Sequence, residues 1–244
     1  MELVYTQNYE IKDNMVDCFG NLKSAQILFI AQDMGTRHCK ELSLSYDTLA
    51  GRRMFWAVWR HRVQITRLPK SGETICVETW AMPHTQVAYP RSVVAYDEKG
   101  RELFRAITLW VLKNMDTRES IRPGESGIEV PEVVRGLEIS NPKGIVPRDM
   151  VNSSPRSVGF ADLDRNGHMN NTRYIEWAEN LFTSRFHREH KLKEFTVCYE
   201  AECWEGQVLD MHYDLLEDNT IQVDAYRTEN GKAVRVLSTR MLYA

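Results

Sequence analysis

The sequence predicts an α+β protein built from two tandem copies of one unit, each a long central helix wrapped by an antiparallel sheet. Three observations predict this fold: an Asp-x-x-Gly turn that occurs twice, an apolar helical pattern after each turn, and alternating strands around matching hairpin turns later in each copy. We expect a first unit at residues 1–115, a linker at 116–149 and a second unit at 150–244.

The two turns open the two copies. Residues 17–22 (Asp-Cys-Phe-Gly-Asn-Leu) match residues 164–169 (Asp-Arg-Asn-Gly-His-Met), and Asp and Gly coincide. Each turn leads into a run of apolar residues with a period near 3.6, which predicts a helix. The apolar positions are Leu22, Ala25, Ile27, Leu28, Ala31, Met34 and Gly35 in the first copy, and Tyr174, Ile175, Ala178, Leu181 and Phe182 in the second. A broadly apolar helix is expected to lie against a sheet.

Four strands are expected after each helix. They are Met54–Leu68, Thr74–Met82, Thr85–Tyr96 and Leu103–Lys113 in the first copy, and Phe195–Cys203, Val208–Leu216, Thr220–Thr228 and Val234–Leu242 in the second. Glu-Lys-Gly-Arg at 98–101 and Glu-Asn-Gly-Lys at 229–232 predict a hairpin turn in each copy. Across the copies we align Phe55, Trp59 and Val63 with Phe195, Tyr199 and Cys203, and Thr108 with Thr239.

The composition limits the classes of protein. A net charge of −3 over 244 residues argues against a dedicated nucleic-acid binder. No apolar run approaches the roughly 18 residues of a membrane helix, so we expect no membrane insertion. The first residues resemble no secretory signal, and five scattered cysteines fit reduced thiols. We therefore expect a cytoplasmic protein.

The second copy contains a long motif. Residues 161–177 closely resemble the D-x-N-x-H-x-N-N-x-x-Y-I-x-W stretch of acyl-acyl carrier protein thioesterases, and residues 199–203 (Tyr-Glu-Ala-Glu-Cys) resemble that family's second signature. The resemblance spans nearly the whole chain and implies two tandem hotdog units. Gly167 stands where plant relatives tend to carry a larger polar residue, so the chain looks like a bacterial member.

The resemblance implies hydrolysis of fatty acyl-acyl carrier protein (acyl-ACP), which releases a free fatty acid and terminates chain elongation. ACP would be the partner, and no cofactor or metal is expected. Three alternatives share the fold: an acyl-CoA thioesterase, a hotdog dehydratase, and a non-catalytic module that binds acyl thioesters. Acyl length, saturation and the choice between monomer and homodimer stay open.

The candidate catalytic residues are Asp164, Asn166, His168 and Glu202. The first three occupy alternate positions before a helix, so their side chains can converge, and unpaired amides near Met169 would suit an oxyanion. Glu202 enters through the resemblance alone. We expect Asp164 to act as a general base for water or to attack directly, giving a mixed anhydride. Asn166 and His168 would hold the nucleophile or the carbonyl oxygen, and Glu202 would position the water. Helix capping is the alternative role for the Asp and Asn.

Cys203 is a possible but disfavoured nucleophile, as part of a Cys-His-Asn set. On a strand, alternation would send Glu202 and Cys203 to opposite faces, which would place Cys203 in the core. The first copy has Asn21 in place of His168 and Phe19 in place of Asn166, so we expect one active site per chain.

The first unit is then free to hold the acyl chain. Candidate chain-binding residues, for each of which ordinary core packing is the alternative, are Ile27, Phe29, Ile30, Met34, Trp56, Val58 and Trp110. A basic stretch is predicted to dock the acidic carrier, with a solvated strand face as the alternative. It comprises Arg52, Arg53, Arg60, Arg62, Arg67 and Lys70.

Overall fold

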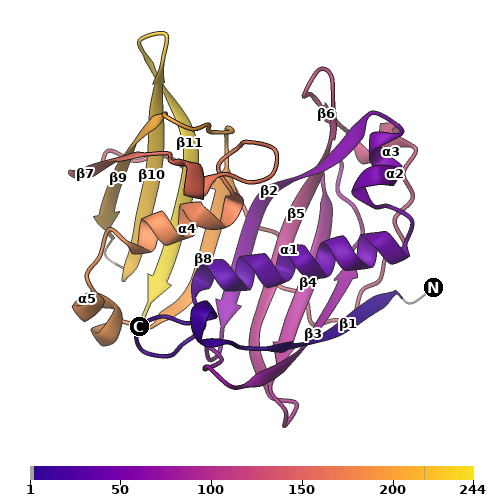
Figure 1. Cartoon of the computed structure of the whole chain (residues 1–244), viewed down its shortest axis with the longest axis horizontal. Coiled ribbons are helices and arrows are strands. Elements are labelled where there is room, and N and C mark those ends of the chain that lie inside the picture. The colour runs from indigo at the N-terminus through magenta and orange to yellow at the C-terminus, as the bar shows by residue number, and fades with distance from the viewer. Residues whose placement is uncertain (1–2, 217) are drawn as a thin grey trace. The chain divides into compact units, whose positions relative to one another are not determined.

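The computed structural model describes residues 3–216 and 218–244, and the chain divides into two compact units, Met1–Pro142 and Lys143–Ala244. The division falls inside the segment 116–149 that was predicted as a linker. In each unit a helix lies across an antiparallel sheet (Figure 1). Among the described residues, no helix is both long enough and apolar enough to cross a membrane.

The first unit has one sheet whose strands run in the order β1-β3-β4-β5-β2, with β6 paired to β5. Neighbouring strands are antiparallel. The elements are β1 (Val4–Glu10), the 3-10 turn η1 (Asp13–Met15), α1 (Ser24–Glu41), α2 (Tyr46–Ala50), β2 (Met54–Ile65), β3 (Thr74–Ala81), β4 (Tyr89–Tyr96), β5 (Glu102–Asn114), β6 (Ser120–Ile121) and α3 (Pro123–Ser126).

The second unit repeats this arrangement, with strand order β7-β9-β10-β11-β8. The strands β1, β3, β4, β5 and β2 of the first unit correspond, in that order, to β7, β9, β10, β11 and β8 of the second. The predicted duplication and the hotdog fold are therefore confirmed. The elements are β7 (Asn152–Ser157), the 3-10 turn η2 (Phe160–Asp162), α4 (Asn171–Glu179), α5 (Ser184–Glu189), β8 (Leu192–Tyr199), β9 (Val208–Leu215), β10 (Thr220–Glu229) and β11 (Lys232–Tyr243).

Helix α1 forms the centre of the first unit's core. Its 18 residues pack on β1 and β3, and Ile27, Leu28, Ile30 and Met34 are fully buried. Burying each such side chain contributes about 1.5–3 kcal/mol. Gly35 lets the helix approach the sheet closely, because a Cβ at this position would lie 3.3 Å from the Arg91 side chain.

The second unit differs from the prediction in its helix. A long central helix was expected there, but α4 has only nine residues, from Asn171 to Glu179. The chain leaves the helix at Asn180, and Thr183 then caps a separate short helix, α5, by accepting a hydrogen bond from the Phe186 amide. A residue with a strong capping side chain therefore starts a new helix where the apolar pattern suggested continuation.

The segment before β7 binds to the sheet of each unit through side-chain hydrogen bonds. In the first unit, Arg105 donates to the Leu137 carbonyl and the Trp80 indole donates to Glu138. In the second unit, Gln222 donates to the Val146 carbonyl, and Arg235 donates to that of Ile145. The segment is thus held in place by these hydrogen bonds although it contains little regular secondary structure.

Candidate active site

The turn at residues 164–168 is held together by the Asp164 side chain. Oδ1 of Asp164 accepts hydrogen bonds from the amides of Asn166 (2.7 Å) and His168 (3.2 Å). The Asp164 amide donates to the His168 carbonyl at 2.7 Å. Gly167 has φ = 78°, a conformation that glycine adopts without strain. The Asn166 side-chain nitrogen donates to Oδ2 of Asp164 at 3.5 Å. This second oxygen takes no part in the two backbone hydrogen bonds that Oδ1 accepts.

The first copy contains the same turn without the same functional groups. Oδ1 of Asp17 accepts from the amides of Phe19 (2.8 Å) and Asn21 (3.0 Å), and Gly20 also has φ = 78°. Asp17 therefore forms the turn where no His is present. By analogy, Oδ1 of Asp164 is committed to local structure, and any chemistry of Asp164 must use Oδ2.

His168 and Glu202 are brought together. Nε2 of His168 lies 3.8 Å from Oε2 of Glu202, within ion-pair range when the imidazole is protonated. The His168 side chain is 20% exposed and the Glu202 side chain 33% exposed, so solvent reaches the pair only partly. The imidazole also meets the Trp204 ring edge-on, with 5.5 Å between the ring centres. The Glu202 carboxylate and the Trp204 ring therefore both contact the imidazole.

The start of α4 offers fewer unpaired amides than expected. The helix begins at Asn171, two residues after Met169, and the Asn170 side chain caps it by accepting from the Thr172 amide. The Met169 amide donates to the Cys203 carbonyl, and the His168 amide to Asp164. The amides of His168, Met169 and Thr172 are therefore already paired, and the side chains of Asn166 and His168 are further donors of the turn.

Glu202 and Cys203 do not lie on a strand, which corrects the prediction. Strand β8 ends at Tyr199, and both residues belong to the loop that follows it. They still diverge: Glu202 reaches His168, whereas Cys203 is fully buried. Burial raises the pKa of the Cys203 thiol, although hydrogen bonds with Tyr174 and Arg227 act in the opposite direction. A buried thiol with a raised pKa is a poor nucleophile at neutral pH.

The alignment of Cys203 with Val63 is also wrong. His61 pairs with Thr108 in the first unit, and Val197 pairs with Thr239 in the second. When the two threonines are matched, Val63 is therefore equivalent to Tyr199, not to Cys203. The Cys203 carbonyl accepts from Met169 just as the Pro69 carbonyl accepts from Leu22. Cys203 therefore corresponds to Pro69.

Two residues of the site, Arg227 and Trp204, were not predicted from the sequence. Arg227, from β10, donates to the Glu202 carbonyl, and its guanidinium lies 5.4 Å from the centre of the Trp204 ring. Arg227 also pairs with Glu229 at 3.0 Å. These contacts fix the loop that aims Glu202 at His168. Nothing in the local sequence around Arg227 indicates this role, because the contact joins distant segments.

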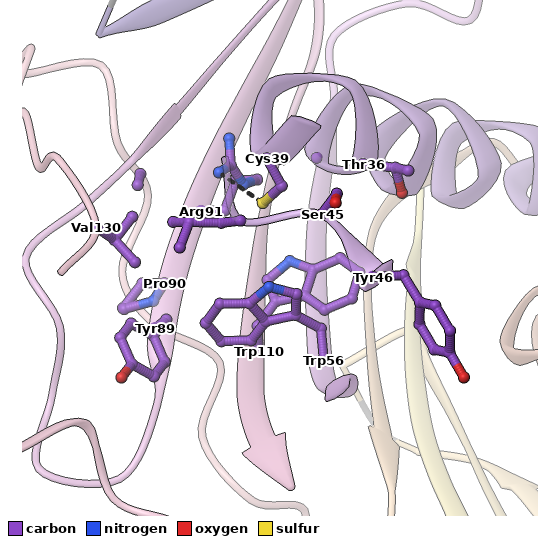
Figure 2. A pocket seen from close by; sticks show the side chains of 13 residues that line it. Thr36, Cys39, Ser45, Tyr46, Trp56, Tyr89, Pro90, Arg91, Trp110 and Val130 are labelled. Carbon is purple, nitrogen blue, oxygen red and sulfur yellow. Dashed lines mark hydrogen bonds between the residues drawn. The ribbon is translucent and has the colours of Figure 1, made fainter. Parts of the chain in front are cut away.

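A cavity of about 180 Å³ lies within the first unit, between the C-terminal half of α1, the segment leading into α2, and the strands β2, β4 and β5 (Figure 2). Of the predicted acyl-binding residues, Trp56 and Trp110 line it. Ile27, Ile30 and Met34 are fully buried in the core, which agrees with the packing alternative, and Phe29 is 53% exposed. Among the described residues, Val58 does not line this cavity, so its acyl-binding role stays a prediction.

The predicted carrier-docking residues make contacts within the first unit. Arg53 pairs with the Asp116 carboxylate and Arg67 with that of Glu73, while Lys70 is exposed. Three other arginines contact neutral groups: Arg52 the Gly127 carbonyl, Arg60 the Pro142 carbonyl and Arg62 the Ser140 hydroxyl. The ion pairs of Arg53 and Arg67 reduce the charge available for a partner, and docking here stays a prediction.

Comparison with known proteins gives one family over both units. The model of the acyl-ACP thioesterase N-terminal domain matches residues 2–125, and that of the C-terminal domain matches residues 147–240. The chain is 27% identical over 233 residues to an oleoyl-ACP thioesterase of Arabidopsis thaliana, covering 85% of this chain and 63% of that protein. It is 26% identical over 241 residues to a palmitoyl-ACP thioesterase of Gossypium hirsutum, covering 89% and 56%. The chain thus spans less than two thirds of the length of these relatives.

Solved structures share the fold. An acyl-ACP thioesterase from Bacteroides thetaiotaomicron superimposes with a TM-score of 0.87 at 21% identity, covering 99% of this chain and 98% of the other. A 12:0-ACP thioesterase from Umbellularia californica gives 0.83 at 22% identity, covering 100% and 98%. Both matches extend over both units.

Proposed function

The chain belongs to the acyl-ACP thioesterase family, and from this premise we propose that it hydrolyses the thioester of a fatty acyl group carried on ACP and releases the free fatty acid. The observation that carries the proposal is the pairing of His168 with Glu202 beside the Asp164 turn, in the second unit. The equivalent turn of the first unit has Asn21 and Phe19 instead. One catalytic centre per chain is therefore proposed.

In the proposed reaction, Oδ2 of Asp164 takes a proton from water as the water oxygen adds to the thioester carbonyl carbon. The ring N–H of His168, held beside Glu202, and the side-chain amide of Asn166 donate to the oxyanion and stabilise it. Collapse of the tetrahedral intermediate expels the carrier thiolate, which recovers the proton from Asp164. Direct attack by Oδ2 would instead give a mixed anhydride that water then cleaves.

An isotopic label can identify direct attack. A single turnover in ¹⁸O-water places the label in the Asp164 carboxylate only if this carboxylate attacks the carbonyl and water then cleaves the anhydride at the Asp164 acyl carbon. Mass spectrometry of the peptide that contains Asp164 detects that incorporation. Label in that peptide identifies direct attack, whereas label confined to the fatty acid is expected both from base-activated water and from cleavage of the anhydride at the fatty acyl carbon.

The carrier is tested by comparing hydrolysis of the same acyl group on ACP and on CoA. We expect a higher kcat/KM on ACP, because the matched family models are those of acyl-ACP thioesterases. A higher kcat/KM on CoA would make the protein an acyl-CoA thioesterase, and binding without release of thiol would make it a non-catalytic module. A cytoplasmic location belongs to the same proposal and is supported by five free cysteines.

A further inference from the structure

The cavity of the first unit has apolar walls and unusual donors. The indole Nε1 atoms of Trp56 and Trp110 are buried, and no hydrogen-bond acceptor meets either of them among residues 3–216 and 218–244. Both rings line the cavity, and the Trp56 ring packs edge-on against Tyr89 at 4.9 Å between ring centres. A buried N–H without an acceptor is costly, so such donors favour a ligand that brings one.

A buried cation lies in the same cavity. Arg91 is 4% exposed and donates to Nδ1 of His38 at 2.9 Å and to the Thr79 hydroxyl at 3.4 Å. Its third contact is the sulfur of Cys39 at 3.7 Å, drawn as a dashed line in Figure 2. Across the part of the chain that the structure describes, Arg91 forms no ion pair with a carboxylate. A buried guanidinium without a carboxylate partner is destabilising unless a further anion joins it.

The cation and the indoles lie close to one another. A Cβ placed on Gly35 would lie 3.3 Å from Cδ of Arg91 and 3.6 Å from the Trp110 ring, so Arg91 and Trp110 meet below Gly35. Trp110 is also paired directly with Tyr89 across β4 and β5. At the rim, Thr36 and Tyr46 are exposed, whereas Gly35 and Arg91 are buried. The cavity therefore leads from an open rim to a floor rich in donors.

We propose that this cavity receives an alkyl chain that ends in a carboxylate, with the carboxylate bound by Arg91 and the indole N–H groups of Trp56 and Trp110. Two carboxylate oxygens offer about four lone-pair sites, which suits a guanidinium and two further donors. A volume of about 180 Å³ compares with an engineered cavity of about 150 Å³ that binds benzene, so the bound portion is about six carbons long.

This inference rests on the proposed function only where the source of the carboxylate is concerned. One source is the far end of an acyl group whose other end is the thioester, that is, the monothioester of a dicarboxylic acid. The other source is a released fatty acid, which would act as an inhibitor. The two share the same binding chemistry.

Binding is tested without turnover by calorimetric titration of the full chain with hexanoate and with hexan-1-ol. Hexanoate is expected to bind at least tenfold more tightly than the alcohol, because the charged acceptor satisfies Arg91 as well as the indoles. Trp110→Phe and Trp56→Phe keep an aromatic ring but lose the N–H donor, and each should weaken hexanoate binding about tenfold and hexan-1-ol binding by less, because the hydroxyl oxygen is an uncharged acceptor. Trp59→Phe, on the same strand as Trp56 but outside the cavity, is the matched control and should change neither affinity.

Equal affinity for hexanoate and hexan-1-ol would overturn the proposal, as would hexanoate binding that both Trp→Phe variants leave unchanged. Failure of both probes to bind would mean that the donors are hydrated and that the cavity takes no such ligand. These variants avoid Arg91, whose replacement risks misfolding of the core.

The source is assigned with octanoyl-ACP and suberoyl-ACP, which differ in the terminal carboxylate. Hydrolysis of suberoyl-ACP that Trp110→Phe impairs more than hydrolysis of octanoyl-ACP identifies a dicarboxylic substrate. Inhibition of octanoyl-ACP hydrolysis by hexanoate, relieved in Trp110→Phe, identifies a product site. If hexanoate binds as expected but no acyl-ACP is hydrolysed, the proposed function fails and the binding site stands.

Discussion

The duplicated turn provides a matched pair of substitutions, Asp164→Asn and Asp17→Asn. Asparagine keeps an oxygen that can accept both amide hydrogen bonds, so both turns should persist. The acceptor loses its charge in each case, which weakens two hydrogen bonds. We expect each variant to lose about 1 kcal/mol of unfolding free energy and about 2–4 °C in Tm.

Activity should separate the two variants. Asp164→Asn removes the proposed base and should lower kcat for acyl-ACP by about 10²–10⁴-fold, whereas Asp17→Asn should stay within about twofold of wild type. Calorimetry gives the two Tm values, and thiol release measured with a chromogenic disulfide gives the two rates. If Asp164→Asn keeps wild-type kcat, Asp164 serves only the turn. If both variants lose activity equally, the effect comes from folding and the assignment of a base is refuted.

Three further outcomes are expected. Cys203→Ala should keep kcat within about twofold and lose about 1 kcal/mol of stability, since the thiol is buried and outside the chemistry; total loss of turnover would make Cys203 the nucleophile. Arg227→Met should lower kcat by roughly ten- to a hundredfold with a smaller change in KM, because it releases the loop that positions Glu202. Arg227→Lys should recover part of this loss. A change in Tm without a change in kcat would limit Arg227 to a structural role. Burial lowers the pKa of His61 to about 3, below its unfolded value of about 6.5. Between these two pH values the unfolded chain therefore binds one more proton than the folded chain. The unfolding free energy should fall by up to about 1.4 kcal/mol per pH unit as the pH decreases through this range. His61→Asn should flatten this dependence in denaturant titrations, and an unchanged slope would assign it to other groups.

The fold was predictable where the signals are local. The Asp-x-x-Gly turns need a glycine with positive φ, and Gly20 and Gly167 both provide it. The hairpin turns near Gly100 and Gly231 likewise fix where β4 meets β5 and where β10 meets β11. Such signals require only neighbouring residues, so they survive in a single sequence.

The alignment of the repeats failed where the register depends on tertiary structure. Strand β8 ends at Tyr199, earlier than the apolar pattern suggests, so Cys203 lies outside the strand that was aligned with β2. The loop that carries Glu202 therefore takes its position from contacts with Met169 and Arg227. Neither contact leaves a periodic trace in the sequence.

The candidate site was predictable in part for the same reason. Asp164, Asn166 and His168 lie within five residues and share one turn, whereas Glu202 was placed through the family resemblance. Trp56 and Trp110 were among the predicted acyl-binding residues, but their association with Arg91 in one cavity joins three strands and became visible only in the structure. The presence of Arg91 in β4, a strand of mostly apolar residues, was the one local signal of a buried charge.

The central claim is that the polar cluster of the second unit cleaves acyl-ACP. The most direct measurement is the rate of fatty acid release from acyl-ACP by the wild type, by His168→Ala and by Asn21→Ala, the equivalent position of the first unit. We predict release by the wild type, a loss of at least about a hundredfold in His168→Ala, and a wild-type rate in Asn21→Ala. Undiminished release by a folded His168→Ala protein, or no release by the wild type from any acyl-ACP, would contradict the account.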